Sequence, residues 1–141
     1  MMNSHRSKKR HRAAVIIIRD ARILLIYRFR AGHEYYVIPG GGVHKTETVE
    51  QAAHREIEEE TGLKIEKLTR FCEFENLGQA EYYFLTTKFS GKPEFGGPEL
   101  KKMSPDNVYR LEWVSLDELN RYPLLPQKIK QKIIDKIDSF L

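Results

Sequence analysis

Short apolar runs separated by polar turns fill the first forty residues of the chain. Ala13–Ile18 and Ile23–Tyr27 lie on either side of a polar turn, and a third run, Tyr35–Ile38, stops at Pro39. Short runs of aliphatic, β-branched and aromatic residues bounded by turn-forming residues are typical of β-strands. The pattern therefore predicts a β-hairpin and a third strand, which ends at the glycines 40–42.

A different periodicity begins at Thr48 and predicts a helix. Thr48 followed by Gln51 is a capping-box pattern, and residues 49–60 contain neither Gly nor Pro. Gly62, directly after Thr61, supplies the stop signal. We therefore expect one helix between these two boundaries.

The acidic residues of this helix fall on two sides of a helical wheel. At about 100° per residue, Glu56, Glu59 and Glu60 form one group on the side of the apolar stripe. Glu50 and Glu58 fall outside that group and are predicted to face water. The wheel thus predicts three neighbouring carboxylates at the edge of the core.

The second half of the chain continues the mixture of strands and helices. Phe71–Glu75 and Glu81–Phe89 flank a turn and predict a second hairpin. Ser90–Asn107 is a long segment rich in Gly and Pro, and loops of this length in compact domains are often functional. We expect this loop to be mobile and to order when a ligand binds.

The last third of the chain predicts a strand and two helices. Val108–Val114 has strand character, and Ser115–Glu118 matches a second capping box that would open a short helix. Behind Pro126, an apolar residue recurs every four positions and predicts a terminal amphipathic helix. The order of elements indicates one mixed α/β domain.

The charge of the chain is unevenly distributed. The net charge is +4, but five basic residues lie in residues 1–12, and the rest of the chain carries a net charge of −1. We expect a basic flexible arm over residues 1–12 and a single domain over residues 13–141. Such an arm could bind nucleic-acid phosphates, although a solvated segment without a specific partner is the favoured interpretation.

Composition also restricts the class of protein. No apolar run approaches the roughly 20 residues of a membrane-spanning helix, so no membrane partner is expected. The single cysteine, Cys72, cannot form an intramolecular disulfide, which fits a cytoplasmic protein. A homodimer is left open.

The group of three glutamates indicates a metal site. Carboxylates three and four positions apart on a helix repel one another, and placing them beside a core is costly unless a cation neutralises them. Oxygen ligands without His or Cys suit Mg²⁺ or Mn²⁺, which commonly share their ligands with substrate phosphates. The alternative interpretation is an ordinary solvated helix face.

The spacing from Gly41 to Leu63 matches a complete 23-residue signature. Gly41 and Glu47 are followed by Arg55-Glu-Ile-Glu-Glu-Glu-Thr-Gly-Leu63, with every constrained position present. In this segment the chain resembles the Nudix hydrolases, the MutT-like pyrophosphohydrolases. The resemblance implies an α/β/α sandwich around a mixed β-sheet. It also implies hydrolysis of a phosphoanhydride bond in a nucleoside diphosphate-linked substrate, with Mg²⁺ or Mn²⁺ as cofactor.

The resemblance also implies roles for residues of the signature. Glu56, Glu59 and Glu60 would bind metal, together with the carbonyl group of Gly40 or Gly41. Arg55 would pair with Glu47 and orient the loop that precedes the helix. The general base would be Glu59, or a carboxylate of the long loop, with Glu99 the first choice and Glu94 the second.

Substrate contacts are predicted from residue type and position. Arg28 could meet phosphates, Tyr27 and Tyr82 could stack on a base, and the backbone of Gly41 and Gly42 allows close approach of a ligand. For the tyrosines, packing in the core is the alternative, and for Arg28 the alternative is simple solvation by water.

The favoured substrate is a nucleoside triphosphate or related nucleotide, oxidised dGTP included. Three alternatives stay open: an RNA 5′-pyrophosphohydrolase, a dinucleoside polyphosphate hydrolase, and a catalytically silent Nudix domain that binds a ligand.

Overall fold

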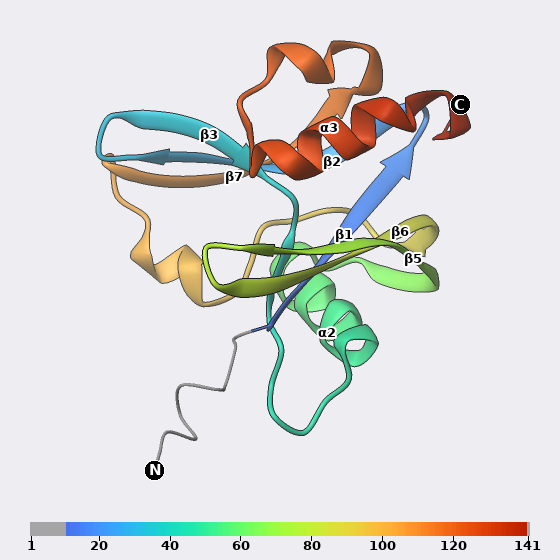
Figure 1. Ribbon diagram of the computed structural model, residues 1–141. Coiled ribbons are helices and arrows are strands. Elements are labelled where there is room, and N and C mark those ends of the chain that lie inside the picture. Colours follow the sequence, from blue (N-terminus) through green and yellow to red (C-terminus); the bar gives the residue numbers. More distant parts are fainter. Residues whose placement is uncertain (1–10, 141) are drawn as a thin grey trace.

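A mixed β-sheet with helices on both sides makes up the fold, which a computed structural model describes over residues 11–140 (Figure 1). The strands are β1 (His11–Arg19), β2 (Arg22–Arg30), β3 (His33–Val37), β4 (Gly40–Gly42), β5 (Lys64–Asn76), β6 (Gln79–Ser90), β7 (Asn107–Ser115) and β8 (Leu124–Leu125). The helices are α2 (Val49–Thr61) and α3 (Gln127–Asp135), and the 3₁₀ segments are η1 (Pro98–Lys102), η2 (Leu116–Arg121) and η3 (Ile137–Phe140). The predicted α/β/α sandwich is confirmed.

The sheet has the strand order β5-β6-β1-β2-β3-β8, with β4 also paired to β1 and β7 to β2. The β1–β6 and β3–β8 pairs are parallel, and the other pairs are antiparallel. The predicted first hairpin exists only beside its turn, where Ile18 pairs with Ile23 and Arg19 with Arg22. Beyond these residues β1 pairs with β4 and β6, while β2 pairs with β3 and β7, so the sheet divides into two parts.

Strand β1 is buried on both faces and separates two apolar cores. Its odd-numbered residues from Ala13 to Ile17 pack in the same cluster as Ile57 of α2. Its even-numbered residues pack in a second cluster, which contains Ile129 and Ile133 of α3. This double burial explains why β1 has a continuous apolar run instead of alternating apolar and polar residues.

Helix α2 begins and ends where the sequence predicts. The hydroxyl of Thr48 accepts a hydrogen bond from the Gln51 backbone N–H at 3.0 Å, and the Thr48 N–H donates to the Gln51 side chain at 2.8 Å. Gly62 adopts the left-handed conformation, with φ at 75°, and its N–H donates to the carbonyl of Glu58. A residue without a Cβ adopts this φ at little cost, which fixes the end of the helix.

Three predictions at other boundaries are wrong. Ser115 makes no capping hydrogen bond with its side chain, and the segment it precedes is the 3₁₀ helix η2. The terminal helix α3 ends at Asp135 and is followed by η3, so its apolar repeat is shorter than expected. Arg12, assigned to the basic arm, lies within β1.

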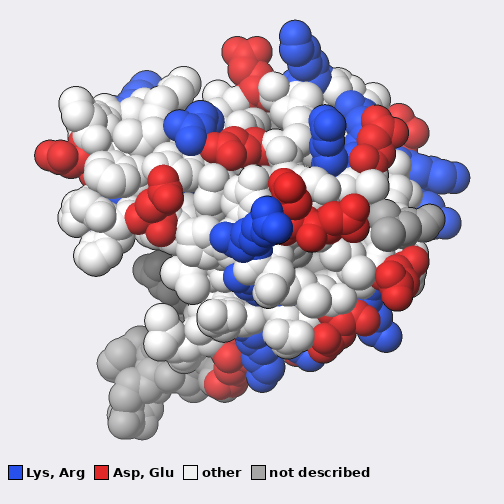
Figure 2. Space-filling view, turned by 90° about the horizontal axis from the view of Figure 1, so that it is seen from above, with Lys and Arg blue, Asp and Glu red and all other residues white. Residues whose placement is uncertain are grey.

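The rest of the predicted basic arm, residues 1–10, lies outside the described residues. On the face shown in Figure 2, basic and acidic side chains are interspersed. Among residues 11–140, no helix is long and apolar enough to cross a membrane.

Candidate active site

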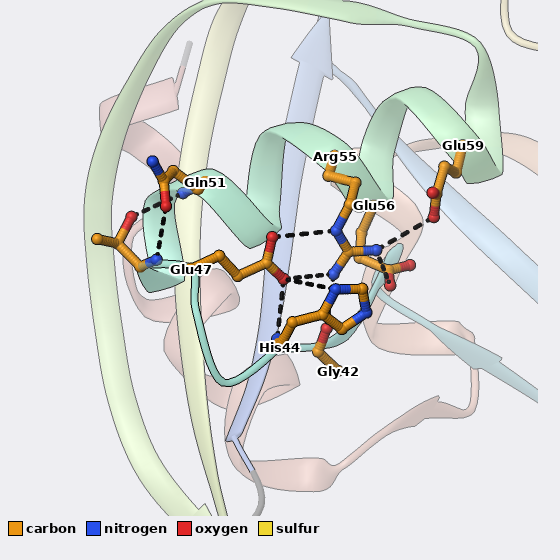
Figure 3. A network of polar contacts seen from close by, with 8 residues as sticks. Gly42, His44, Glu47, Gln51, Arg55, Glu56 and Glu59 are labelled. Atoms are coloured by element: carbon orange, nitrogen blue, oxygen red, sulfur yellow. Dashed lines mark hydrogen bonds and ion pairs between the residues drawn. The ribbon is translucent and has the colours of Figure 1, made fainter.

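Arg55 of α2 is the centre of a polar network at the predicted site (Figure 3). Its Nε donates to Glu47 Oε2 at 3.1 Å and its Nη2 donates to Glu47 Oε1 at 2.6 Å, which is a two-point contact between guanidinium and carboxylate. Nη2 also donates to the carbonyl of Gly42 at 2.9 Å. The predicted pair is therefore present, and it ties the loop ahead of α2 to the helix.

The same guanidinium also holds two carboxylates of the helix. Nη1 donates to Glu56 Oε2 at 2.9 Å and to Glu59 Oε1 at 3.2 Å. Hydrogen bonds from Arg55, and then from the His44 N–H, lower the pKa of Glu47 to about 2. Arg55 thus offsets part of the repulsion that the clustered acids would otherwise create.

The glycine segment of β4 lies directly against the carboxylates of α2. The Gly40 N–H donates to Glu60 Oε1 at 2.9 Å. A Cβ on Gly41 would overlap the Glu56 carboxylate, and a Cβ on Gly40 would overlap the backbone of Ala13 and Ala14. Glycine is therefore required here so that backbone and carboxylates can approach closely.

Glu60 has an unusual electrostatic environment. The pKa of its carboxyl is raised to about 8, chiefly by burial and also by the charges of Glu56 and Glu99, although the Gly40 hydrogen bond and the charge of Arg12 lower it. A carboxylate in this position is stabilised by an added positive charge.

A cavity of about 290 Å³ brings many of these groups together. It is lined by three carboxylates, two arginines and the three glycines of β4, with apolar and aromatic neighbours: Glu56, Glu60, Glu99, Arg12, Arg28, Gly40, Gly41, Gly42, Ile26, Tyr35, Val37 and Tyr109. We call it the carboxylate cavity. Anionic and cationic side chains on one surface, beside bare backbone, suit a ligand that carries both a metal ion and phosphates.

The long loop between β6 and β7 is attached to the end of α2. The Glu94 N–H donates to the Thr61 carbonyl and the Gly96 N–H to the Glu60 carbonyl, both at 2.9 Å. These bonds satisfy two carbonyls that a helix end leaves without a partner. They help to position Glu99 at the carboxylate cavity, whereas Glu94 is exposed and does not line it. Movement of this loop on ligand binding stays a prediction.

Glu59 differs from the wheel prediction. Its side chain is 53% exposed, close to the 58% of Glu58, and it does not line the carboxylate cavity. Its carboxylate turns instead to Arg55, because its long side chain can reach the guanidinium at the helix surface. Glu59 therefore lies just outside the carboxylate cavity, on the same guanidinium that also contacts Glu56.

The side chains and backbone at the cavity offer oxygen donors to a divalent cation. Among residues 11–140, no group of three or more His, Cys, Asp or Glu side chains is gathered closely enough to hold a metal ion. The donors available are nonetheless all oxygens, from Glu56, Glu60, Glu99 and the glycine backbone. Such a set of donors suits Mg²⁺ or Mn²⁺.

The predicted substrate residues separate into two groups. Arg28, Gly41 and Gly42 line the carboxylate cavity. Tyr27 is buried in the core on the α3 side and donates its hydroxyl to Glu34 at 2.7 Å. Tyr82 packs against the core on the α2 side and stacks on His11. Neither tyrosine lines the cavity, so both follow the packing alternative.

Arg28 is buried without a carboxylate partner among residues 11–140. Its side chain lies 3.6 Å from the ring centre of Tyr109, and the residue is 6% exposed. Its Nη1 and Nη2 donate to the neutral Asn107 Oδ1 at 3.3 and 3.1 Å. A buried cation with only a neutral acceptor is suited to an anionic ligand.

Sequence reasoning missed a second cavity and the role of Arg12, which lines both cavities. This apolar cavity measures about 470 Å³ and is lined by Arg12, Val37, Ile38, Asn76, Leu77, Glu81, Tyr83, Leu125, Pro126 and Gln127. Arg12 also lines the carboxylate cavity. Arg12 directly precedes the first apolar run. This position could have predicted that it is the first inward-facing residue of the strand.

A comparison of the chain with known families decides its membership. Residues 9–136 match the family model described as the NUDIX domain. The chain belongs to this family. This confirms the resemblance that the signature indicated, and the chain is accordingly a hydrolase that acts on pyrophosphate bonds.

Individual relatives agree with the Nudix assignment. An oxidized purine nucleoside triphosphate hydrolase of Danio rerio is 30% identical over 125 residues, which are 81% of this chain and 78% of the relative. The crystal structure of a MutT Nudix hydrolase from Burkholderia pseudomallei is 35% identical, with a TM-score of 0.70, covering 88% of this chain and 96% of the other. The ORF135 protein of E. coli, at 24% identity and a TM-score of 0.72, covers 96% of this chain and 95% of its own and shows the same fold.

Proposed function

We propose that this Nudix hydrolase cleaves a phosphoanhydride bond of a nucleoside triphosphate, with oxidised purine nucleotides such as oxidised dGTP among its substrates, and that it requires Mg²⁺ or Mn²⁺. The observation that carries the proposal is the carboxylate cavity, where Glu56, Glu60 and Glu99 share one surface with Arg28 and bare glycine backbone. The similarity to a Danio rerio protein named for oxidised purine nucleoside triphosphates supports the choice of substrate.

Each residue has a role that follows from its position. Glu56 and Glu60 would hold the metal, with Glu59 and the carbonyl of Gly40 as further ligands. When bound, Mg²⁺ or Mn²⁺ would supply positive charge to the phosphates and would lower the pKa of a coordinated water. Arg55 acts indirectly, because its contacts with Glu47, Glu56 and the Gly42 carbonyl fix the glycine loop against the helix.

Arg28 binds a phosphate oxygen of the substrate. Its guanidinium lies over the Tyr109 ring and is positioned by Asn107, so little side-chain entropy is lost when the phosphate binds. The Gly41 and Gly42 backbone leaves space beside the carboxylates for the same phosphate chain.

Glu99 is the group we propose as general base. It lines the carboxylate cavity, whereas Glu59, the candidate on the helix, is exposed and hydrogen-bonded to Arg55. Glu99 accepts the proton of the attacking water as the oxygen bonds to phosphorus and the anhydride oxygen leaves. Loss of a general base typically costs about 10²–10⁴-fold in rate.

The base assignment is tested by Glu99→Gln and Glu59→Gln, with Glu94→Gln as the control from the same loop. We expect Glu99→Gln to reduce kcat by at least about 10²-fold and Glu94→Gln to leave it within about twofold. Full turnover in Glu99→Gln together with a large loss in Glu59→Gln would move the base into the helix.

A substrate panel tests the proposed function itself. The wild-type chain is assayed with Mg²⁺ and with Mn²⁺ on dGTP, oxidised dGTP, a dinucleoside polyphosphate and an RNA with a 5′-triphosphate. We expect metal-dependent release of phosphate or pyrophosphate from the nucleoside triphosphates at the highest kcat/KM. Preference for the dinucleoside polyphosphate or the RNA would replace the proposed substrate, and no hydrolysis with either metal would indicate a silent ligand-binding domain.

A further inference from the structure

Arg12 lies where the two cavities meet. In β1 it pairs with Gly42 of β4 on one side and with Glu81 of β6 on the other. It lines both the carboxylate cavity and the second, apolar cavity. Val37 of β3 is the other described residue that lines both cavities.

The guanidinium of Arg12 has unused hydrogen-bonding capacity among residues 11–140. Its Nη2 donates to the Ile38 carbonyl at 2.7 Å, and this contact fixes the end of the side chain. No carboxylate forms an ion pair with it among the described residues. A guanidinium has five N–H donors in a planar fork, so a held but unpaired one is suited to bind an oxyanion.

The nearby acids do not serve as its partner. Both oxygens of Glu81 are occupied, since Oε1 accepts from the Tyr83 hydroxyl at 2.6 Å and Oε2 from Asn76 Nδ2 at 3.1 Å. Glu60 accepts from the Gly40 N–H and lies within electrostatic range of Arg12 without a direct contact. A metal ion beside Glu60 would compete for that carboxylate, which leaves Arg12 for the ligand.

The second cavity has the character of a site for the uncharged part of a ligand. Its walls include Val37, Ile38, Leu125 and Pro126, and its acidic residue Glu81 is already satisfied by hydrogen bonds. Among the lining residues that the structure describes, Arg12 is the only cationic partner for a phosphate there. The two cavities therefore differ in chemistry, and Arg12 lies between them.

We propose that Arg12 is a substrate-binding residue whose guanidinium holds the phosphate that is bonded to the nucleoside. This proposal rests on the proposed function and deepens it. The phosphate chain then occupies the carboxylate cavity, the nucleoside extends into the apolar cavity, and Arg12 fixes that direction. The phosphate held by Arg12 is the one that stays with the nucleoside after cleavage.

The test measures binding of dGMP, a nucleoside monophosphate with no anhydride bond to cleave, by calorimetry in the presence of Mg²⁺. Wild type is compared with Arg12→Gln, Arg12→Lys and Arg22→Gln. Arg22 is exposed at the β1–β2 turn and lines neither cavity, so its variant controls for the lost positive charge. Mn²⁺ affinity and melting temperature are measured on all four proteins.

We expect Arg12→Gln to weaken dGMP binding at least tenfold, with Mn²⁺ affinity within twofold of wild type. Arg12→Lys retains the charge without the fork and should recover part of the loss, and Arg22→Gln should bind like wild type. In the hydrolysis assay, Arg12→Gln should raise KM more than it lowers kcat.

Two results would overturn the assignment. Unchanged dGMP affinity in Arg12→Gln would remove Arg12 from the binding site. An equal loss of dGMP and Mn²⁺ affinity would show that Arg12 only supports the Glu60 region. Because dGMP binding needs no turnover, a wild type that binds dGMP but hydrolyses no nucleotide would refute the proposed function and leave this test intact.

Discussion

The two sides of helix α2 carry the same residue type in opposite environments. Glu56 and Glu60 line the carboxylate cavity, beside glycine backbone and the loop that bears Glu99. Glu50 and Glu58 are about half exposed, and their partners are exposed as well, with Arg70 at 3.2 Å from Glu50 and Lys64 at 4.0 Å from Glu58. The difference arises from what packs against each side and not from the helix itself.

The comparison separates a functional cluster from a solvated one. Exposed ion pairs contribute about 0–1 kcal/mol each, because water competes and long side chains lose entropy on pairing. The carboxylates of Glu56 and Glu60 lie instead at the carboxylate cavity, and burial raises the pKa of Glu60. Acids kept in such a place reduce stability unless a cation joins them, which is the physical basis for assigning a metal to this side alone.

The largest effect is expected on turnover. Glu56→Gln removes a charge from the metal side and should lower kcat about 10³-fold, since it weakens the electrostatic stabilisation of the reacting phosphates. Glu58→Gln removes the same charge from the solvent side and should leave kcat within about twofold. The assay uses the best nucleotide of the panel at saturating Mg²⁺, and comparable losses in the two variants would remove the distinction between the faces.

A smaller effect is expected on stability. Arg55→Lys loses the two-point contact with Glu47 and the links to Glu56 and Glu59, and should lower the free energy of unfolding by about 1–2 kcal/mol. Glu50→Gln, which breaks the exposed contact with Arg70, should change it by less than about 0.5 kcal/mol. Urea denaturation of the metal-free proteins measures both, and equal losses would contradict the contrast between the two sides.

A third effect concerns pH. In the folded chain the Glu60 carboxyl has a pKa of about 8, above its ordinary value of 4.5, so folding takes up a proton between these two values. This group therefore makes the metal-free chain less stable as pH rises through that window, with no further change above it.

Glu60→Gln should remove this dependence. Between pH 5 and pH 8.5 in a chelating buffer, the melting temperature should fall further in wild type than in Glu60→Gln, by at least about 4 °C. Glu58→Gln should keep the wild-type fall, and a fall of equal size in Glu60→Gln would show that its carboxyl has an ordinary pKa.

The sequence predicts the helix and its contacts best where the determinants are local. The capping residues Thr48 and Gln51 and the stop at Gly62 act within a few positions, and each has the expected geometry. The Arg55–Glu47 pair was implied by the signature, since the spacing of its charged residues brings the loop back onto the helix.

Residues on strands were harder to place because their surroundings depend on distant pairing. Tyr27 and Arg28 are neighbours on β2 and must face opposite sides of the sheet. Nothing local tells which side meets α2, and the structure places Arg28 at the cavity and Tyr27 in the other core. Arg12 was missed for a related reason, since the division between β1 and β2 and the pairing of β1 with β6 are long-range features.

Direct metal titration of two matched double variants tests the central claim, that the cavity side of α2 holds the metal. Glu56→Gln/Glu60→Gln and Glu50→Gln/Glu58→Gln each remove two carboxylates from the same helix, so their net charges are equal. Calorimetric titration with Mn²⁺ should show at least a hundredfold loss of affinity in the first and a change within about twofold in the second. Equal Mn²⁺ affinities in the two double variants would contradict the assignment of the metal to this side of the helix.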